Sequence, residues 1–168
     1  MSAGPDLDVL ARDVLAALAR RGATVATAES LTGGQLAAAI TAVPGASASY
    51  VGGVVSYATQ VKVSVLGVSA ELVAAFGVIS RECASAMARG AAALTGATYA
   101  LSTTGVAGPD PQEGHPPGTV YVAVVGPFGQ EVLALDLAGD RAAIQDQTCR
   151  AALSALGGIL DQEERGLG

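Results

Sequence analysis

The fold class is decided by residues 23–34, which read Ala23-Thr24-Val25-Ala26-Thr27-Ala28-Glu29-Ser30-Leu31-Thr32-Gly33-Gly34. The first six residues are small or apolar and predict a short buried strand, and the last six predict a turn. Apolar residues recur at helical spacing over residues 8–21, and Gly22 suits the C-cap of that helix. A second helix is predicted over residues 35–43, ended by Pro44-Gly45. A buried strand between two helices is typical of an α/β protein.

The rest of the chain continues with strands and helices. Further strands are predicted at residues 53–57, 98–103, 120–125 and 131–137. Further helices are predicted at residues 59–66, 70–76, 81–94 and 140–160, with Ser80 and Asp140 as N-caps of the last two. We therefore expect one domain over residues 1–168, a three-layer α/β/α sandwich with a mixed, mostly parallel sheet of about five strands. The tail after Asp161 is expected to be frayed.

Composition excludes several classes of protein. The 168 residues are 51% hydrophobic and only 14% charged, which excludes global disorder. No run of about 18 apolar residues is present, so we expect no membrane span. The net charge of −6 argues against a nucleic-acid partner. Two cysteines are too few for a disulfide scaffold, and the first residues are not those of a signal peptide, so a cytoplasmic protein is expected.

Common catalytic motifs are absent from the sequence. It has no Gly-x-x-x-x-Gly-Lys-Ser/Thr phosphate loop, no Gly-x-Gly-x-x-Gly fingerprint and no His-Glu-x-x-His zinc motif. His115 is the single histidine, and its position beside Pro116-Pro117 favours an exposed loop residue over the base of a triad. One histidine cannot build a multi-histidine metal site, so we expect no metal.

The turn at residues 29–34 is the first candidate site. A junction from a buried strand to a helix exposes backbone N–H groups and the positive end of the helix dipole. The hydroxyl of Ser30 could act there as a nucleophile, and Gly33 and Gly34 would let a ligand approach the backbone. An ordinary Ser/Thr N-cap with glycines that ease the turn fits the pattern equally well.

A serine nucleophile without a usable histidine needs another base, and Lys62 is the single lysine of the chain. Burial among apolar neighbours would favour the neutral amine that a base requires. Tyr57, five residues earlier, could orient the amine or relay a proton. The alternative is a solvated helix lysine, although every other basic position in the chain is an arginine.

Two further segments are candidates for ligand binding. Thr103–Asp110 follows a predicted strand, and ligands of open α/β sheets bind outside the carboxyl ends of strands. This loop and the Ser30 turn could therefore line one pocket; the alternative is a long connection without function. Arg141, in Gly139-Asp140-Arg141, could meet a phosphate, or it could be an exposed residue after a capped helix start.

Taken together, these segments resemble the CinA C-terminal domain family, whose active members are nicotinamide-nucleotide amidohydrolases. The likeness covers nearly the whole chain, in order and at fitting spacing. The matching stretches are Thr27–Gly34, Gly52–Tyr57, Val61-Lys62, Leu66–Val68, Gly77–Ser80, Thr104–Pro109, Gly118–Val120 and Gly139–Arg141.

The resemblance implies a three-layer α/β/α domain that hydrolyses the carboxamide of nicotinamide mononucleotide to nicotinic acid mononucleotide and ammonia. It implies Ser30 as the nucleophile, Lys62 as the base and Tyr57 as the third catalytic residue, with no metal or organic cofactor. It also implies a stand-alone domain that forms a homo-oligomer. The substrate, a small-molecule nucleotide, is expected to contact Thr32, Gly33, Gly34, Thr104, Gly105, Ala107, Gly108 and Arg141.

The chain also departs from the family pattern. Leu31 stands where cysteine is frequent, and Thr59 stands where asparagine is frequent. The loop after Pro109 is commonly Gly-rich and leads to Lys-Pro, whereas residues 110–117 read Asp-Pro-Gln-Glu-Gly-His-Pro-Pro here. Gln145 stands where a second arginine is common. The alternatives are a catalytically weak nucleotide-binding or interaction module of the same fold, or an amidase for a related small amide.

Overall fold

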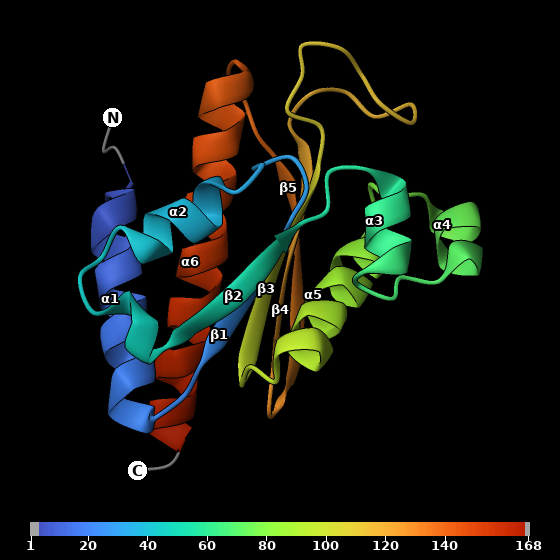
Figure 1. Cartoon of the computed structure of the whole chain (residues 1–168). Coiled ribbons are helices and arrows are strands. Elements are labelled where there is room, and N and C mark those ends of the chain that lie inside the picture. Colours follow the sequence, from blue (N-terminus) through green and yellow to red (C-terminus); the bar gives the residue numbers. More distant parts are fainter. Residues whose placement is uncertain (1–3, 167–168) are drawn as a thin grey trace.

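The computed structural model describes residues 4–166, and its centre is a five-stranded sheet (Figure 1). The strands are β1 (Val25–Glu29), β2 (Tyr50–Val55), β3 (Tyr99–Gly105), β4 (Thr119–Gly126) and β5 (Gly129–Asp136). Their order across the sheet is β2-β1-β3-β4-β5. β1 pairs in parallel with β2 and β3, whereas β4 is antiparallel to both β3 and β5. The sheet is therefore mixed, and β4 alone runs against the other strands.

Helices cover both faces of the sheet. Helices α1, α2 and α6 lie on one face, and α3, α4 and α5 lie on the other (Figure 1). Their bounds are Leu7–Arg21 (α1), Gln35–Thr41 (α2), Thr59–Ser64 (α3), Ala70–Phe76 (α4), Arg81–Thr95 (α5) and Arg141–Gly166 (α6), with a 3-10 turn at Ala46–Ala48. The expected three-layer α/β/α architecture is confirmed.

Two apolar layers hold the sandwich together. Leu18, Leu36 and Leu153 belong to the core on the side of α1, α2 and α6, and Met87 and Ala100 belong to the core on the side of α5. Every residue of β1 is buried, as is typical of a central parallel strand with helices on both sides. This explains why residues 25–28 are small or apolar; Glu29, at the end of the strand, is buried as well.

The second strand begins at Tyr50, three residues before the predicted start, and ends at Val55 rather than Tyr57. The hydroxyl of Tyr50 lies 2.8 Å from Oγ1 of Thr27 on β1. A Cβ at Gly53 would lie 2.2 Å from the same Oγ1, so only glycine fits beside this hydrogen bond. Gly53, which makes room for Tyr50, and its neighbour Gly52 also weaken the strand signal in the sequence.

The last helix continues to Gly166, beyond the predicted end near Leu160, so residues 162–166 are helical where a frayed tail was expected. Leu160 is fully buried. One turn later the carboxylate of Glu163 accepts hydrogen bonds from Arg21, at 2.8 Å, and from the hydroxyl of Tyr99. These contacts to α1 and β3 extend the helix. Residues 167–168 lie outside the described part.

The carboxyl ends of β1 and β3 meet at one edge of the sheet, because the two strands are parallel and adjacent. The loop over residues 106–118 follows β3 at this edge, and the β4–β5 turn lies at the opposite end (Figure 1). Helix α3 reaches the same edge, and the segment that follows it packs closely on α5, since a Cβ at Gly90 would lie 2.0 Å from the carbonyl oxygen of Leu66. Within residues 4–166, no helix has the length and apolar character needed to cross a membrane.

Candidate active site

The turn after β1 is held by the carboxylate of Glu29, which is almost completely buried. It accepts hydrogen bonds from the backbone N–H groups of Leu36 and Ala37, at 2.8 and 3.0 Å, and from the hydroxyl of Thr32, at 2.7 Å. A negative charge at the first turn of α2 is favoured by the exposed N–H groups and by the helix dipole. Glu29 thus fixes the path of the chain on both sides of Ser30.

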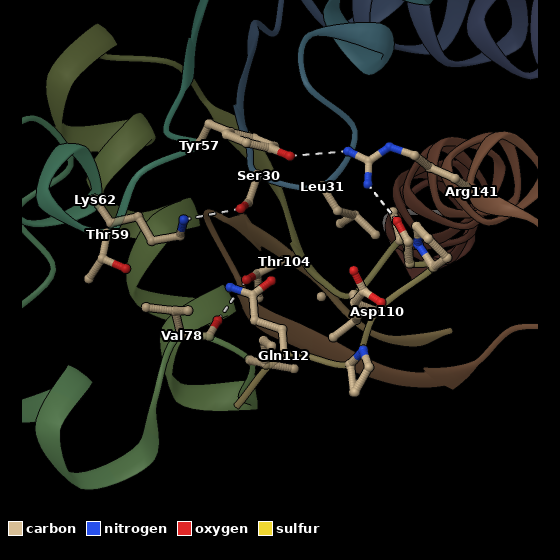
Figure 2. Close-up of a pocket in the computed structure, with 17 residues that line it drawn as sticks. Ser30, Leu31, Tyr57, Thr59, Lys62, Val78, Thr104, Asp110, Gln112 and Arg141 are labelled. Carbon is tan, nitrogen blue, oxygen red and sulfur yellow. Dashed lines mark hydrogen bonds between the residues drawn. The ribbon is translucent and has the colours of Figure 1, made fainter. Parts of the chain in front are cut away.

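Lys62 points from α3 toward Ser30 (Figure 2). Its side chain is only 1% exposed, and its Nζ lies 3.1 Å from Oγ of Ser30 and 2.6 Å from the carbonyl oxygen of Ser56, to which it donates. Burial lowers the pKa of Lys62 below its ordinary value, because desolvation disfavours the ammonium form. The charges of Cys83 and Glu113 act in the opposite direction, and they are the smaller effect. The alternative of a solvated helix lysine is therefore wrong.

Tyr57 and Arg141 form a bridge above the Ser30 turn. Tyr57 is 63% exposed, and its hydroxyl accepts a hydrogen bond from Nη2 of Arg141 at 3.1 Å. Nη1 of Arg141 donates to the carbonyl oxygen of Gly108 at 2.7 Å. Arg141 forms no salt bridge with any carboxylate among residues 4–166, so its charge faces neutral acceptors only. The amine of Lys62 is oriented by the Ser56 carbonyl, and the Tyr57 hydroxyl is directed toward Arg141 instead (Figure 2).

These side chains line one cavity of about 410 Å³, a volume that suits a small-molecule ligand. Figure 2 places Lys62 and Ser30 on one side of the cavity and Arg141 on the other. The loop after β3 forms much of the remaining wall. The lining residues are Ser30, Leu31, Tyr57, Thr59, Lys62, Val78, Ile79, Thr104, Gly105, Val106, Ala107, Gly108, Pro109, Asp110, Pro111, Gln112 and Arg141.

Eight of the eleven residues predicted for catalysis or binding line this cavity, and Thr32, Gly33 and Gly34 do not. Thr32 is buried, and its hydroxyl contacts Glu29 and Thr103. The N–H of Gly33 donates to the carbonyl oxygen of Ser30 at 3.0 Å. The N–H of Gly33 therefore shapes the turn itself.

Sequence reasoning missed the part of the wall formed by Val78 and Ile79. Thr104 holds this segment, since its hydroxyl donates to the carbonyl oxygen of Val78 at 2.6 Å. The one available signal was the stretch Gly77–Ser80 between two predicted helices, which is among the stretches that resemble the family. Gln145 lies outside the cavity lining, and its side-chain amide donates to the carbonyl oxygen of Leu31 at 2.8 Å. No group of three or more potential metal ligands occurs within residues 4–166.

Comparison with known proteins identifies the family. The model of the CinA C-terminal domain matches residues 7–160. The chain is 51% identical over 146 residues to the CinA-like protein of Frankia casuarinae, covering 87% of this chain and 34% of that relative. It is 47% identical over 156 residues to the CinA-like protein of Anaeromyxobacter sp. strain K, covering 91% of this chain and 38% of that relative. The chain thus spans about a third of the length of these curated relatives.

Solved structures of similar length share the fold. A CinA superfamily protein from Klebsiella pneumoniae superposes with a TM-score of 0.91 at 38% identity, covering 94% of this chain and 99% of that one. The competence/damage inducible protein CihA from Agrobacterium tumefaciens superposes with a TM-score of 0.88 at 35% identity, covering 96% and 99% of the two chains. The sequence match over residues 7–160 and these superpositions agree, and the chain belongs to the CinA C-terminal domain family.

Proposed function

We propose that this protein hydrolyses the carboxamide of nicotinamide mononucleotide to nicotinic acid mononucleotide and ammonia, with Ser30 as nucleophile and Lys62 as base. The observation that carries the proposal is the 3.1 Å separation of Lys62 Nζ and Ser30 Oγ inside a cavity. Burial lowers the pKa of this amine and so favours its neutral form, which can accept the proton of a hydroxyl. The substrate follows from the nucleotide amidohydrolases that the sequence resembles.

The proposed reaction has two halves. In the first, Lys62 takes the hydroxyl proton of Ser30, and Oγ forms a bond to the amide carbon. The C–N bond then breaks while the Lys62 ammonium returns its proton to the leaving nitrogen, which departs as ammonia. In the second half, water gives a proton to Lys62 and attacks the ester carbon. The Ser30–carbon bond breaks, Ser30 regains its proton from Lys62, and the acid is released.

The carbonyl of Ser56 supports this assignment of Lys62. A neutral amine has two N–H groups and one lone pair. One N–H donates to the Ser56 carbonyl oxygen at 2.6 Å, and this contact leaves the lone pair free to face the Ser30 hydroxyl. The Ser56 carbonyl therefore acts as an anchor that keeps the amine beside the nucleophile.

The negative charge that develops on the amide oxygen needs a donor. The N–H groups of Gly33, Leu36 and Ala37 are already bound to Ser30 and Glu29, so they do not supply it. Leu31 follows the nucleophile and lines the cavity, and its backbone N–H is our candidate donor. The N–H of the residue after the nucleophile serves this purpose in other serine hydrolases.

Arg141 supports a substrate with an anionic group. Its guanidinium lies across the cavity from Lys62 and has no carboxylate partner among the described residues (Figure 2). A guanidinium binds phosphate through charge-assisted hydrogen bonds. A nucleotide with its amide at Ser30 and its phosphate at Arg141 would use both sides of the cavity.

The test is ammonia release from nicotinamide mononucleotide by the purified protein, with Ser30→Ala as the paired variant. We expect release by the wild type and at least about a thousandfold less by the variant, because nucleophile and base act as a unit. Equal rates in the two proteins would overturn the role of Ser30. A folded wild type that binds the nucleotide without releasing ammonia would instead be a binding module, and release from a different small amide alone would change the substrate.

A further inference from the structure

The tip of the loop over residues 106–118 is a tight turn with an unusual residue. Gln112 and His115 exchange two backbone hydrogen bonds, of 3.0 and 2.8 Å, around Glu113 and Gly114. Both central residues have positive φ, 50° for Glu113 and 77° for Gly114, as in a type I′ turn. Asparagine, aspartate and glycine are favoured in this conformation and glutamate is not. Among the described residues, Glu113 is the one non-glycine residue with positive φ.

The side chain of Glu113 accounts for its presence in the turn. Its Oε2 accepts hydrogen bonds from the backbone N–H groups of Val78 and Ile79, at 3.1 and 3.3 Å. Gly77 makes room for the carboxylate, since a Cβ there would lie 2.5 Å from Oε2. The segment before α5 therefore offers two N–H donors and a gap that fit one carboxylate.

Glu113 joins two walls of the cavity. Val78 and Ile79 line one wall, and the residues just before Glu113, from Asp110 to Gln112, line another. Other side-chain ties hold the two ends of this loop. Arg141 donates to the carbonyl oxygen of Gly108 near its start, and the hydroxyl of Thr119 donates to that of Pro116, at 2.9 Å, near its end. The contact through Glu113 holds the tip between them.

We propose that Glu113 is a positioning residue, which binds the Val78 and Ile79 N–H groups and thereby keeps the loop wall closed against the Ser30–Lys62 side of the cavity. The inference rests on the proposed function for its kinetic consequence only. In Glu113→Ala the loop wall is free to move away. The affinity for nicotinamide mononucleotide should then fall by about tenfold or more, because a hydrogen bond to a charged group contributes a free energy that corresponds to a change of about this size. The rate of the chemical step, set by Ser30 and Lys62, changes less than the affinity.

The charge of Glu113 gives a second readout, in the pH profile. Glu113 raises the pKa of Lys62 and opposes the larger effect of burial. Glu113→Gln removes this charge, so the acid limb of the kcat/KM profile moves to lower pH. The other ionisable groups around Lys62 are unchanged in this variant: Cys83 on α5, and Tyr57, Asp110 and Arg141 in the cavity lining. A purely structural role of Glu113 would leave the profile in place.

The direct test is amide hydrogen exchange at Val78 and Ile79 in the full chain, which does not depend on catalysis. We expect about fivefold or faster exchange at both amides in Glu113→Ala, with a smaller effect in Glu113→Gln, because glutamine retains one acceptor oxygen. Gly77→Ala is the second variant, since its Cβ would displace the carboxylate while Glu113 remains. Glu131→Gln, which removes an exposed carboxylate on β5, is the matched control and should match the wild type.

The outcomes separate the two proposals. The positioning role is supported by two results: faster exchange in Glu113→Ala and Gly77→Ala, and weaker nucleotide binding when either change is added to Ser30→Ala than in Ser30→Ala alone. This holds even if the wild type releases no ammonia. Unchanged exchange at Val78 and Ile79 in a folded Glu113→Ala protein overturns it, whatever the activity. Faster exchange with an unchanged nucleotide affinity also overturns it, because the contact made by Glu113 would then have no effect on binding.

Discussion

The amine of Lys62 lies 3.1 Å from the hydroxyl of Ser30, although 32 positions separate the two residues. Ser30 follows a central strand, and Lys62 belongs to a short helix on the α5 face of the sheet. Their meeting depends on the carbonyl of Ser56, just after β2, and on the close packing of Leu66, just after α3, against Gly90 of α5. The distance between the two side chains is thus set jointly by the segments that follow β1 and β2 and by α3.

The rate of ammonia release should depend on pH through Lys62. Burial lowers the pKa of this amine, and only its neutral form accepts a proton, so kcat/KM should fall as pH drops through the lowered pKa. Lys62→Arg should lose about a thousandfold in rate at every pH, since a guanidinium stays charged. Initial rates across the pH range in both proteins provide the check, and a flat wild-type profile would contradict a lysine base.

The free energy of unfolding should also depend on pH through the lowered pKa of Lys62. The native pKa of Lys62 is below the ordinary value of 10.5, so the unfolded chain binds more protons between the two pKa values. The free energy of unfolding should therefore rise with pH in that window, by up to about 1.4 kcal/mol per pH unit, and level off above it. Urea unfolding of wild type and Lys62→Met at several pH values tests this. Parallel curves for the two proteins would contradict burial of a neutral amine.

Gly90→Ala should disturb the arrangement of Ser30 and Lys62, although Gly90 does not line the cavity. Alanine normally stabilises a helix interior by about 1 kcal/mol relative to glycine. At this position the added Cβ would lie 2.0 Å from the carbonyl oxygen of Leu66, so the segment after α3 must move away from α5. This segment is tied to Lys62, whose carbonyl oxygen accepts from the N–H of Val68 at 3.1 Å, so the amine should shift with it. We expect a lower Tm and about tenfold or greater loss of kcat. Gly158→Ala, on α6 with open space around the new Cβ, is the control and should raise the Tm slightly.

Arg141→Gln should weaken binding of the nucleotide and spare its unphosphorylated riboside. Loss of a charged hydrogen bond to phosphate raises KM by about tenfold to a hundredfold, with kcat nearly unchanged. Steady-state kinetics on the two substrates measures the difference. The control is Arg150→Gln on the same helix, where the arginine pairs with Asp146. Equal effects of Arg141→Gln on both substrates would place the phosphate elsewhere.

Tyr57→Phe distinguishes two roles for the phenol. Its hydroxyl accepts from Arg141, so its loss should loosen the guanidinium and raise KM by about two- to fivefold. If Tyr57 relays a proton to Lys62, kcat falls instead, and the pH profile changes with it. Separate values of kcat and KM for the variant decide between these roles.

The sequence was sufficient for the elements whose signals are local. The Ser30 turn combines an apolar strand with two glycines, and a single lysine in an arginine-rich chain draws attention to Lys62. The burial of Thr32 was not predictable in this way. It depends on Glu29, whose carboxylate accepts hydrogen bonds from the Thr32 hydroxyl and from two backbone N–H groups of α2. The residues of the turn therefore resemble a ligand cradle in the sequence, although the N–H groups of Gly33, Leu36 and Ala37 are occupied in the structure.

Long-range contacts limited the rest of the prediction. The Val78–Ile79 wall is placed by Thr104, 26 positions later, and by Glu113. The partner of the Tyr57 hydroxyl is 84 positions away on α6. Neither contact leaves a periodic pattern in the sequence, since each depends on how three layers pack.

The antiparallel return of β4 has a practical consequence. It sends the turn between β4 and β5 to the end of the sheet remote from the cavity, and Phe128 at the tip of that turn is 77% exposed. Exposed loop tips tolerate insertions well. A fluorophore or affinity tag at this turn would let the protein be immobilised or observed in single-molecule experiments while the cavity at the opposite end of the sheet stays free.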